Sequence, residues 1–222
     1  MLHRGALVKT RNPSLYLARC YLLAALLSFV TFSTAAPLTN EGARVAEVID
    51  ALHVEAHWPA GQHINWETGI PDGRPVTTQG KHTHCSAFVA SAAEHLGVYI
   101  LRPPEHGQTL LANAQWDWLD SAAAAVQGWH PVRDGVEAQE KANQGELVVV
   151  VYKNHNPEKP GHIAIVRPSD KSETALLNEG PQITQAGGTN YRSATLREGF
   201  KSHPGAWSNG EIRFFAHAVS LH

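Results

Sequence analysis

The sequence predicts an α+β domain in which helices come first and a mostly antiparallel sheet follows. Apolar residues recur at helical spacing over 40–58 and 84–96. Two runs rich in β-branched residues, at 147–152 and 162–167, are typical of neighbouring buried strands. Helices in the first half and strands in the second are the pattern of a single α+β domain.

The length, composition and net charge of the chain exclude several classes of protein. The chain has 222 residues, of which 43% are hydrophobic and 17% charged, and its formal net charge is -2. These values fit one globular domain, or at most two, with a substantial apolar core. They exclude a collagen-like, strongly disordered or polybasic chain, so we expect no nucleic-acid partner.

The N-terminus has the pattern of an export signal. Its first 20 residues contain four basic residues and no acidic one, and an apolar run over 21–32 and small residues over 33–36 follow. This order predicts a secretory signal peptide over 1–36, because the run is shorter than the ~20 apolar residues that span a bilayer. An uncleaved anchor helix is the alternative. We expect a single secreted or periplasmic domain over 37–222, without stable membrane insertion.

Cleavage leaves an acidic domain with one thiol. Without the four basic residues of the signal segment, 14 of the 18 Lys and Arg residues remain against 20 Asp and Glu residues. The mature domain then has a net charge of about -6. Cys20 is lost with the segment and Cys85 remains. In a compartment where cysteines normally form disulfides, a lone thiol is either buried and inert or chemically employed.

The remaining elements follow from apolar spacing and from Gly, Pro and capping residues. In chain order they are a helix from Thr39 or Asn40 to about Trp58, a loop to Lys81, a helix from Thr83 or His84 to Leu96, a helix within 108–125, a hairpin of strands 147–152 and 162–167, a short helix over 172–178, a strand over 182–186 and a closing strand over 211–219.

Cys85 belongs to the first turn of the second predicted helix. The unpaired N–H groups of such a turn stabilise a thiolate by about 1 kcal/mol and can also bind a developing oxyanion. Cys85 also shares an apolar stripe with Phe88, Val89 and Ala92, so a small core residue is the alternative interpretation.

His162 begins a predicted strand immediately after Gly161. Alternation along the strand places Ile163 and Ile165 on one face and His162 on the other. A hydrogen-bonded core histidine is the simplest explanation of any single histidine. The combination with Cys85 distinguishes this one from the other thirteen.

Three segments together resemble the papain-like cysteine amidases and peptidases of the NlpC and CHAP type. They are Cys-Ser-Ala-Phe-Val at 85–89, Gln-Gly-Glu followed by valines at 144–150, and Gly-His-Ile-Ala-Ile-Val at 161–166. The resemblance covers about residues 79–187. It implies a papain-like fold in which an N-terminal helix with the nucleophile, Cys85, packs on an antiparallel sheet whose second strand provides the base, His162.

The resemblance also implies two supporting groups. A third residue on the next strand orients the imidazole, and Gln185 occupies that place; a side-chain carbonyl there would fix the ring tautomer. Other polar residues remain candidates for this role, namely Asn178, Gln182 and Asn190. Gln79 lies six residues before Cys85, at the offset of a side-chain donor to the oxyanion hole.

Together with export, the resemblance implies hydrolysis of an amide bond in peptidoglycan or another peptide substrate. The enzyme would be an endopeptidase or an N-acetylmuramoyl-L-alanine amidase. Among the aromatic residues, Trp116 and Tyr191 are the candidates that would contact substrate in a groove.

We expect no cofactor and no metal. His53 and His57 have helical spacing, but the acid between them is not at the metalloprotease position. His82, His84 and Cys85 are potential zinc ligands, yet no second cysteine of the mature chain closes a structural site. An exported non-catalytic or metal-binding module that retains the fold is the alternative function.

Overall fold

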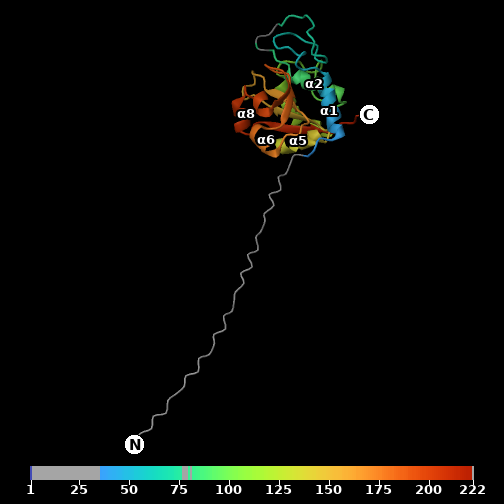
Figure 1. Cartoon of the computed structure of the whole chain (residues 1–222). Helices are drawn as coiled ribbons and strands as arrows, with labels where there is room; N and C mark the ends of the chain where they lie inside the picture. The colour runs from blue at the N-terminus through green and yellow to red at the C-terminus, as the bar shows by residue number, and fades with distance from the viewer. Residues whose placement is uncertain (2–35, 77–79, 81, 222) are drawn as a thin grey trace. The chain divides into compact units, whose positions relative to one another are not determined.

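The computed structural model describes residue 1 and residues 36–76, 80 and 82–221 (Figure 1). The predicted signal segment lies outside the described residues apart from its two ends, and so does Gln79. In the described part of the chain, no helix has both the length and the apolar character needed to cross a membrane.

A six-stranded sheet forms the centre of the fold, with strand order β1-β6-β2-β3-β4-β5. All of its neighbouring pairs are antiparallel. The strands are β1 (His130–Val132), β2 (Leu147–Tyr152), β3 (His162–Val166), β4 (Gln182–Gln185), β5 (Tyr191–Thr195) and β6 (Arg213–His217). The predicted α+β class with an antiparallel sheet is therefore confirmed.

Helices cover both faces of this sheet. The described residues form α1 (Asn40–Ala51), α2 (Cys85–His95), α3 (Leu111–Leu119), α4 (Ala122–Val126), α5 (Gly135–Asn143), α6 (Glu173–Glu179), α7 (Leu196–Gly199) and α8 (Pro204–Ser208). Val149 and Val151 of β2 belong to a core cluster with apolar residues of α1, α2 and α3. Val148 and Val150 belong to a second cluster with residues of α5, α7 and α8. Burial on both faces explains why β2 is a continuous apolar run.

The hairpin and the second helix agree with the sequence prediction. β2 and β3 pair antiparallel, with Tyr152 opposite His162. Helix α2 begins at Cys85, and His84 is its N-cap residue. The loop before α2 extends beyond one end of the sheet, where it is drawn in teal (Figure 1).

Several predicted boundaries are wrong. The first helix ends at Ala51 rather than near Trp58, because His53 adopts a left-handed conformation with φ 52°. The predicted helix within 108–125 is two helices, since the Ser121 hydroxyl accepts a bond from Ala124 N and begins α4 anew. Five elements were not predicted, namely β1, α5, β5, α7 and α8.

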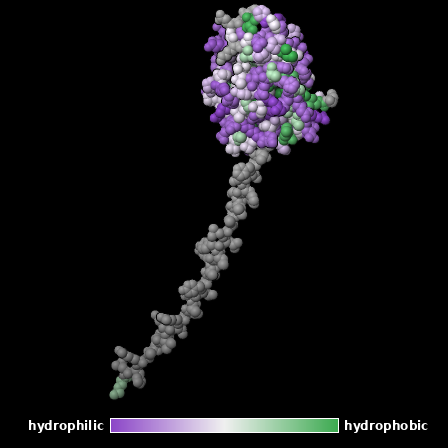
Figure 2. Space-filling model, turned by 45° about the horizontal axis from the view of Figure 1, so that its top comes forward, coloured by the Kyte–Doolittle hydropathy of each residue, from purple (hydrophilic) through white to green (hydrophobic). Residues whose placement is uncertain are grey.

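The face drawn in Figure 2 is mostly hydrophilic, with hydrophobic residues scattered over it. Isolated apolar side chains of this kind are normal on a folded protein and indicate no docking surface by themselves. The most informative surface feature is instead a large cleft beside β3.

Candidate active site

Cys85 is the first residue of α2 and is only 4% exposed. Burial raises the pKa of its thiol, and the backbone N–H groups of Ile163, Ser86 and Cys85 itself partly oppose this effect. The thiol is therefore protonated at neutral pH. Its contact with the N–H of Ile163 places it against the residue that follows His162 on β3.

His162 owes its position to Gly161. A Cβ atom at Gly161 would lie 2.1 Å from the carbonyl oxygen of Tyr152 and 2.6 Å from Oδ1 of Asn113. Only glycine allows this approach of β3 to the end of β2. Asn113 also anchors the intervening loop, since its Nδ2 donates to Lys159 O (2.9 Å) and its Oδ1 accepts from Asn154 N (3.1 Å).

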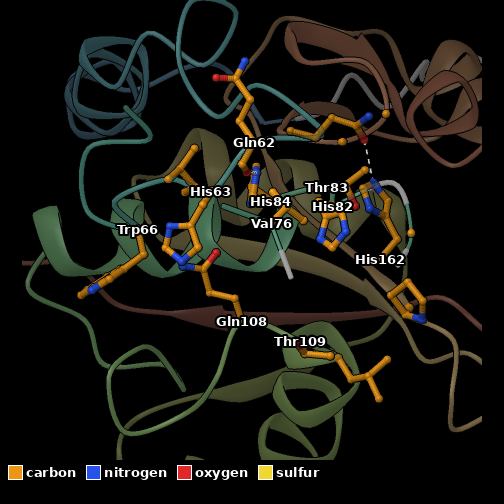
Figure 3. Close-up of a pocket in the computed structure, with 18 of the residues that line it drawn as sticks. Gln62, His63, Trp66, Val76, His82, Thr83, His84, Gln108, Thr109 and His162 are labelled. Carbon is orange, nitrogen blue, oxygen red and sulfur yellow. Dashed lines mark hydrogen bonds between the residues drawn. The ribbon is translucent and has the colours of Figure 1, made fainter. Parts of the chain in front are cut away.

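Gln185 fixes the tautomer of His162. Nε2 of His162 lies 2.8 Å from Oε1 of Gln185, a bond drawn dashed in Figure 3. The Nε2 amide group of Gln185 donates to Thr189 O (3.2 Å), so its Oε1 faces the imidazole as an acceptor. His162 Nε2 must then carry the hydrogen, which leaves Nδ1 of the neutral ring unprotonated and able to accept a proton.

The electrostatics favour a neutral imidazole. His162 is 7% exposed and Gln185 is 3% exposed. Burial lowers the pKa of His162, and the hydrogen bond to Gln185 opposes this effect without a charge. The thiol of Cys85 and the imidazole of His162 are therefore both neutral, and a neutral imidazole is the form that can act as a general base.

An open cleft of about 1290 Å³ lies over this region. His162 and Gln185 line it, and in Figure 3 Trp66 lies on the opposite side from His162. Among the described residues Cys85 does not line the cleft itself, although its neighbours Thr83 and His84 do. Cys85 is thus a buried residue that directly follows two lining residues in the chain.

His84 stabilises the entry to α2. It is buried, and its Nε2 lies 3.0 Å from Gln62 O, which requires a hydrogen on that nitrogen. Burial lowers the pKa of His84, and the contact with Gln62 opposes this effect. Two buried histidines of lowered pKa therefore adjoin Cys85 in the fold, His84 as the preceding residue and His162 as the residue before Ile163 on β3.

The polar residues predicted as possible partners of the His162 imidazole make different contacts in the structure. Of the four polar residues considered as a partner for the imidazole, Gln185 makes the hydrogen bond to it among the described side chains. Asn190 instead holds the chain after α1, because its Nδ2 donates to Val54 O and His57 O at 2.8 Å each. Gln182 donates to Ser193 Oγ (2.8 Å).

The two candidate aromatic contacts differ in position. Tyr191 lines the cleft, and its hydroxyl donates to Glu198 Oε1 over 2.8 Å. Trp116 is outside the described lining of the cleft and has two cations near its ring, with Lys153 Nζ 5.4 Å and the Arg213 guanidinium 5.0 Å from the ring centroid. Of the two, Tyr191 is positioned to meet a molecule in the cleft.

Potential metal ligands are dispersed. In the ranges that the structure describes, no group of three or more His, Cys, Asp or Glu side chains is arranged to hold a metal ion. The rings of His53 and His57 lie edge to face with centroids 6.0 Å apart.

Comparison with known proteins adds one relationship. No family model matches the chain. The chain is similar to a peptidoglycan amidase. That relative is Tse1 of Pseudomonas aeruginosa, which is 34% identical over 102 residues, 46% of this chain and 53% of the relative. The chain thus spans about half the length of the curated relative that it matches.

Two further contacts of the imidazole were not predicted from the sequence. The Phe200 ring lies 4.7 Å from the His162 ring between centroids, and the His203 ring lies 5.9 Å from it. Both residues come from the segment between α7 and α8, far beyond the histidine in the chain. No local pattern in the sequence indicates such a long-range contact.

Proposed function

We propose that this chain is an exported thiol hydrolase that cleaves an amide bond of peptidoglycan. The observation that carries the proposal is the hydrogen bond from His162 Nε2 to Gln185 Oε1, because it leaves Nδ1 unprotonated as a base. The buried thiol at the N-terminus of α2 meets the same strand at the N–H of Ile163, the next residue. Similarity to a peptidoglycan amidase supports both the reaction class and the substrate.

In the proposed mechanism the substrate carbonyl approaches Cys85 from the cleft. His162 Nδ1 takes the thiol proton as Sγ forms a bond to the carbonyl carbon, and the π electrons move to the oxygen. Backbone N–H groups of the first turn of α2 stabilise this oxyanion, with Gln79 as the proposed side-chain donor. Cys85 and His162 then have the roles of nucleophile and general base.

The imidazolium next gives its proton to the leaving amine. The C–N bond breaks and a thioester to Cys85 remains. A water molecule, deprotonated by His162, attacks the thioester carbonyl and releases the carboxylic acid and the thiol. Gln185 stays neutral throughout and stabilises the tautomer that accepts the proton.

Incubation with purified sacculi tests the reaction. We expect wild type to release soluble fragments that mass spectrometry assigns to one cleaved amide bond, whereas Cys85→Ala and His162→Gln release none above background. His95→Gln is a matched control, because His95 lies at the far end of α2 and bonds Ser91 O within its own helix. Equal release by wild type and Cys85→Ala would refute the mechanism.

Export is tested separately. We expect the protein recovered from outside the cytoplasm to begin near residue 37, as determined by intact mass. Recovery of the uncleaved chain in the membrane fraction would instead support an anchor.

A further inference from the structure

The hydrogen bond to Gln185 leaves one motion of the His162 ring unrestrained. The imidazole is attached through Cβ and is held at Nε2 by Gln185. Rotation of the ring about the line from Cβ to Nε2 would move Nδ1 while keeping the hydrogen bond to Gln185. This rotation costs little energy, because the χ2 torsion of histidine has a broad minimum. A working base must be held within about 0.5 Å and 10–20° of its productive geometry.

Two rings oppose that rotation. Phe200 meets the His162 ring edge to face, at a centroid distance of 4.7 Å and an interplanar angle of 64°. His203 stacks on it at 5.9 Å and 25°. The two are tied together, since His203 N donates to Phe200 O (2.8 Å), and Tyr152 packs on His203 with centroids 5.0 Å apart.

Gly199 lies against Gln185, the hydrogen-bond partner of the His162 ring. A Cβ atom at Gly199 would lie 2.6 Å from Oε1 of Gln185 and 2.3 Å from Cδ1 of Ile183. The acceptor oxygen therefore occupies the space that any side chain at this position would need. Gly199 has no left-handed φ, so the requirement for glycine here comes from contact with Gln185 rather than from backbone conformation.

From these contacts we infer that the segment Gly199–His203 is a brace that positions the general base. Gly199 sets the place of Gln185, while Phe200 and His203 set the plane of the His162 ring. These are positioning residues, which act through His162. The inference rests on the proposed function, because only a base that transfers protons requires this degree of restraint.

Two readouts test the brace. The first is the ¹⁵N spectrum of His162 at neutral pH, which reports its tautomer whether or not the protein is active. The second is the split between kcat and KM on solubilised muropeptides. For Gly199→Ala we expect a mixed tautomer and a fall in kcat on the order of 10- to 100-fold with little change in KM.

Two substitutions of His203 keep the test decisive if the Gly199→Ala variant does not fold. We expect His203→Ala to lower kcat at least about tenfold, whereas His203→Phe, which keeps a stacking ring, recovers most of it. Gly205→Ala in α8 is the matched control, because its Cβ would meet only the flexible end of the Asn209 side chain. It should match wild type in both readouts.

The outcomes separate the two proposals. A single Nε2–H tautomer and unchanged kcat in Gly199→Ala and His203→Ala would overturn the brace. Equal loss in His203→Ala and His203→Phe would also overturn it, since ring stacking would then be irrelevant. If wild type releases nothing from sacculi, the proposed function fails, while the tautomer measurement still decides whether the segment restrains His162.

Discussion

Nε2 of His162 donates to Oε1 of Gln185, and the neutral amide of Gln185 is itself held by Thr189. The tautomer is thus fixed by a group without charge. A carboxylate in the same place would stabilise the imidazolium, whereas an amide leaves the imidazole neutral. With a buried, protonated thiol as the proposed nucleophile, a neutral base is the form that the mechanism requires.

Gln185→Leu removes the acceptor while keeping most of the side-chain volume. We expect kcat on peptidoglycan fragments to fall on the order of 10- to 100-fold, because Nε2 loses its partner and both tautomers become populated. Gln182→Leu is the control, since Gln182 lies on the same strand but bonds Ser193. Equal kcat for the two variants would show that the bond to His162 has no catalytic role.

Gln185→Glu places a carboxylate against His162. We expect the pKa of His162 to rise in this variant, because an opposite charge at hydrogen-bond distance favours the imidazolium. In wild type, burial holds this pKa below 6.5, so activity should be lost only as pH falls below that value. The acidic limb of kcat/KM should move to higher pH in the variant by about one pH unit or more. If the acidic limb lies at the same pH in wild type and Gln185→Glu, it reports the titration of a group other than His162.

Acid should weaken the fold through its buried histidines. Burial lowers the pKa values of His84, His162 and the partly buried His203 below 6.5, so the folded state binds fewer protons than the unfolded state just below that pH. Their contribution to stability is complete above pH 6.5 and decreases as pH falls toward the folded-state pKa values. His84 and His162 each lose about 1.4 kcal/mol for every pH unit between their unfolded and folded pKa values. Urea unfolding at pH 7.5 and 5.5 measures the loss.

The variant His162→Gln should make that loss smaller, because one of the three groups no longer titrates and the charge of His162 no longer opposes protonation of His203. An identical pH dependence in wild type and His162→Gln would contradict the assignment.

Local sequence patterns predicted where Cys85 and His162 lie in the fold, while their catalytic roles stay predictions. Cys85 follows the residue at which α2 is capped, and His162 follows a glycine at the start of β3. Both positions are determined by spacing within a few residues, which is why the sequence alone indicated them. The partner Gln185 was placed by the resemblance, while the sequence left Asn178, Gln182 and Asn190 open as alternatives.

Features that depend on long-range contacts were not predictable. Asn113 contacts the loop after β2 from 41 positions away, and Phe200 reaches His162 from a separate helix end. The first helix was predicted too long because its apolar pattern continues past Ala51, although the backbone turns at His53 and Asn190 binds the carbonyl groups that follow. Apolar spacing records burial and does not record where hydrogen bonds end a helix.

A partly buried ion pair joins α1 to the sheet. Asp50 bonds Arg167 (Oδ2 to Nη2, 2.8 Å) and Arg192 (2.7 Å). Burial opposes ionisation of Asp50, but these two guanidinium groups hold its pKa below the usual 3.8. Asp50→Asn should lower the free energy of unfolding by about 1–3 kcal/mol, because the mostly buried Arg167 loses its counter-ion. Asp120→Asn, which breaks the exposed pair with Arg213, should cost less than about 1 kcal/mol.

Chemical denaturation of both variants measures this difference. A similar small effect of the two substitutions would show that the pair at Asp50 is as solvent-screened as the exposed one. Activity on sacculi should be retained in both, since neither residue lines the cleft among the described residues.

Gly161→Ala links the stability of the hairpin to the position of the base. The new Cβ would overlap the carbonyl oxygen of Tyr152 at 2.1 Å, and because that oxygen belongs to the backbone, the start of β3 must move. We expect a loss of about 1–3 kcal/mol in unfolding free energy. We also expect kcat to fall on the order of 100-fold at temperatures where the variant is still folded, since His162 is the next residue.

Gly107→Ala is the control for stability, because no atom lies within 4 Å of its Cβ position and its backbone conformation accepts alanine. A Gly161→Ala variant of wild-type stability and kcat would mean that β3 can shift without displacing the imidazole. The tight contact with Tyr152 would then be a packing feature of the hairpin alone, and the position of the base would depend on Gln185 and the brace.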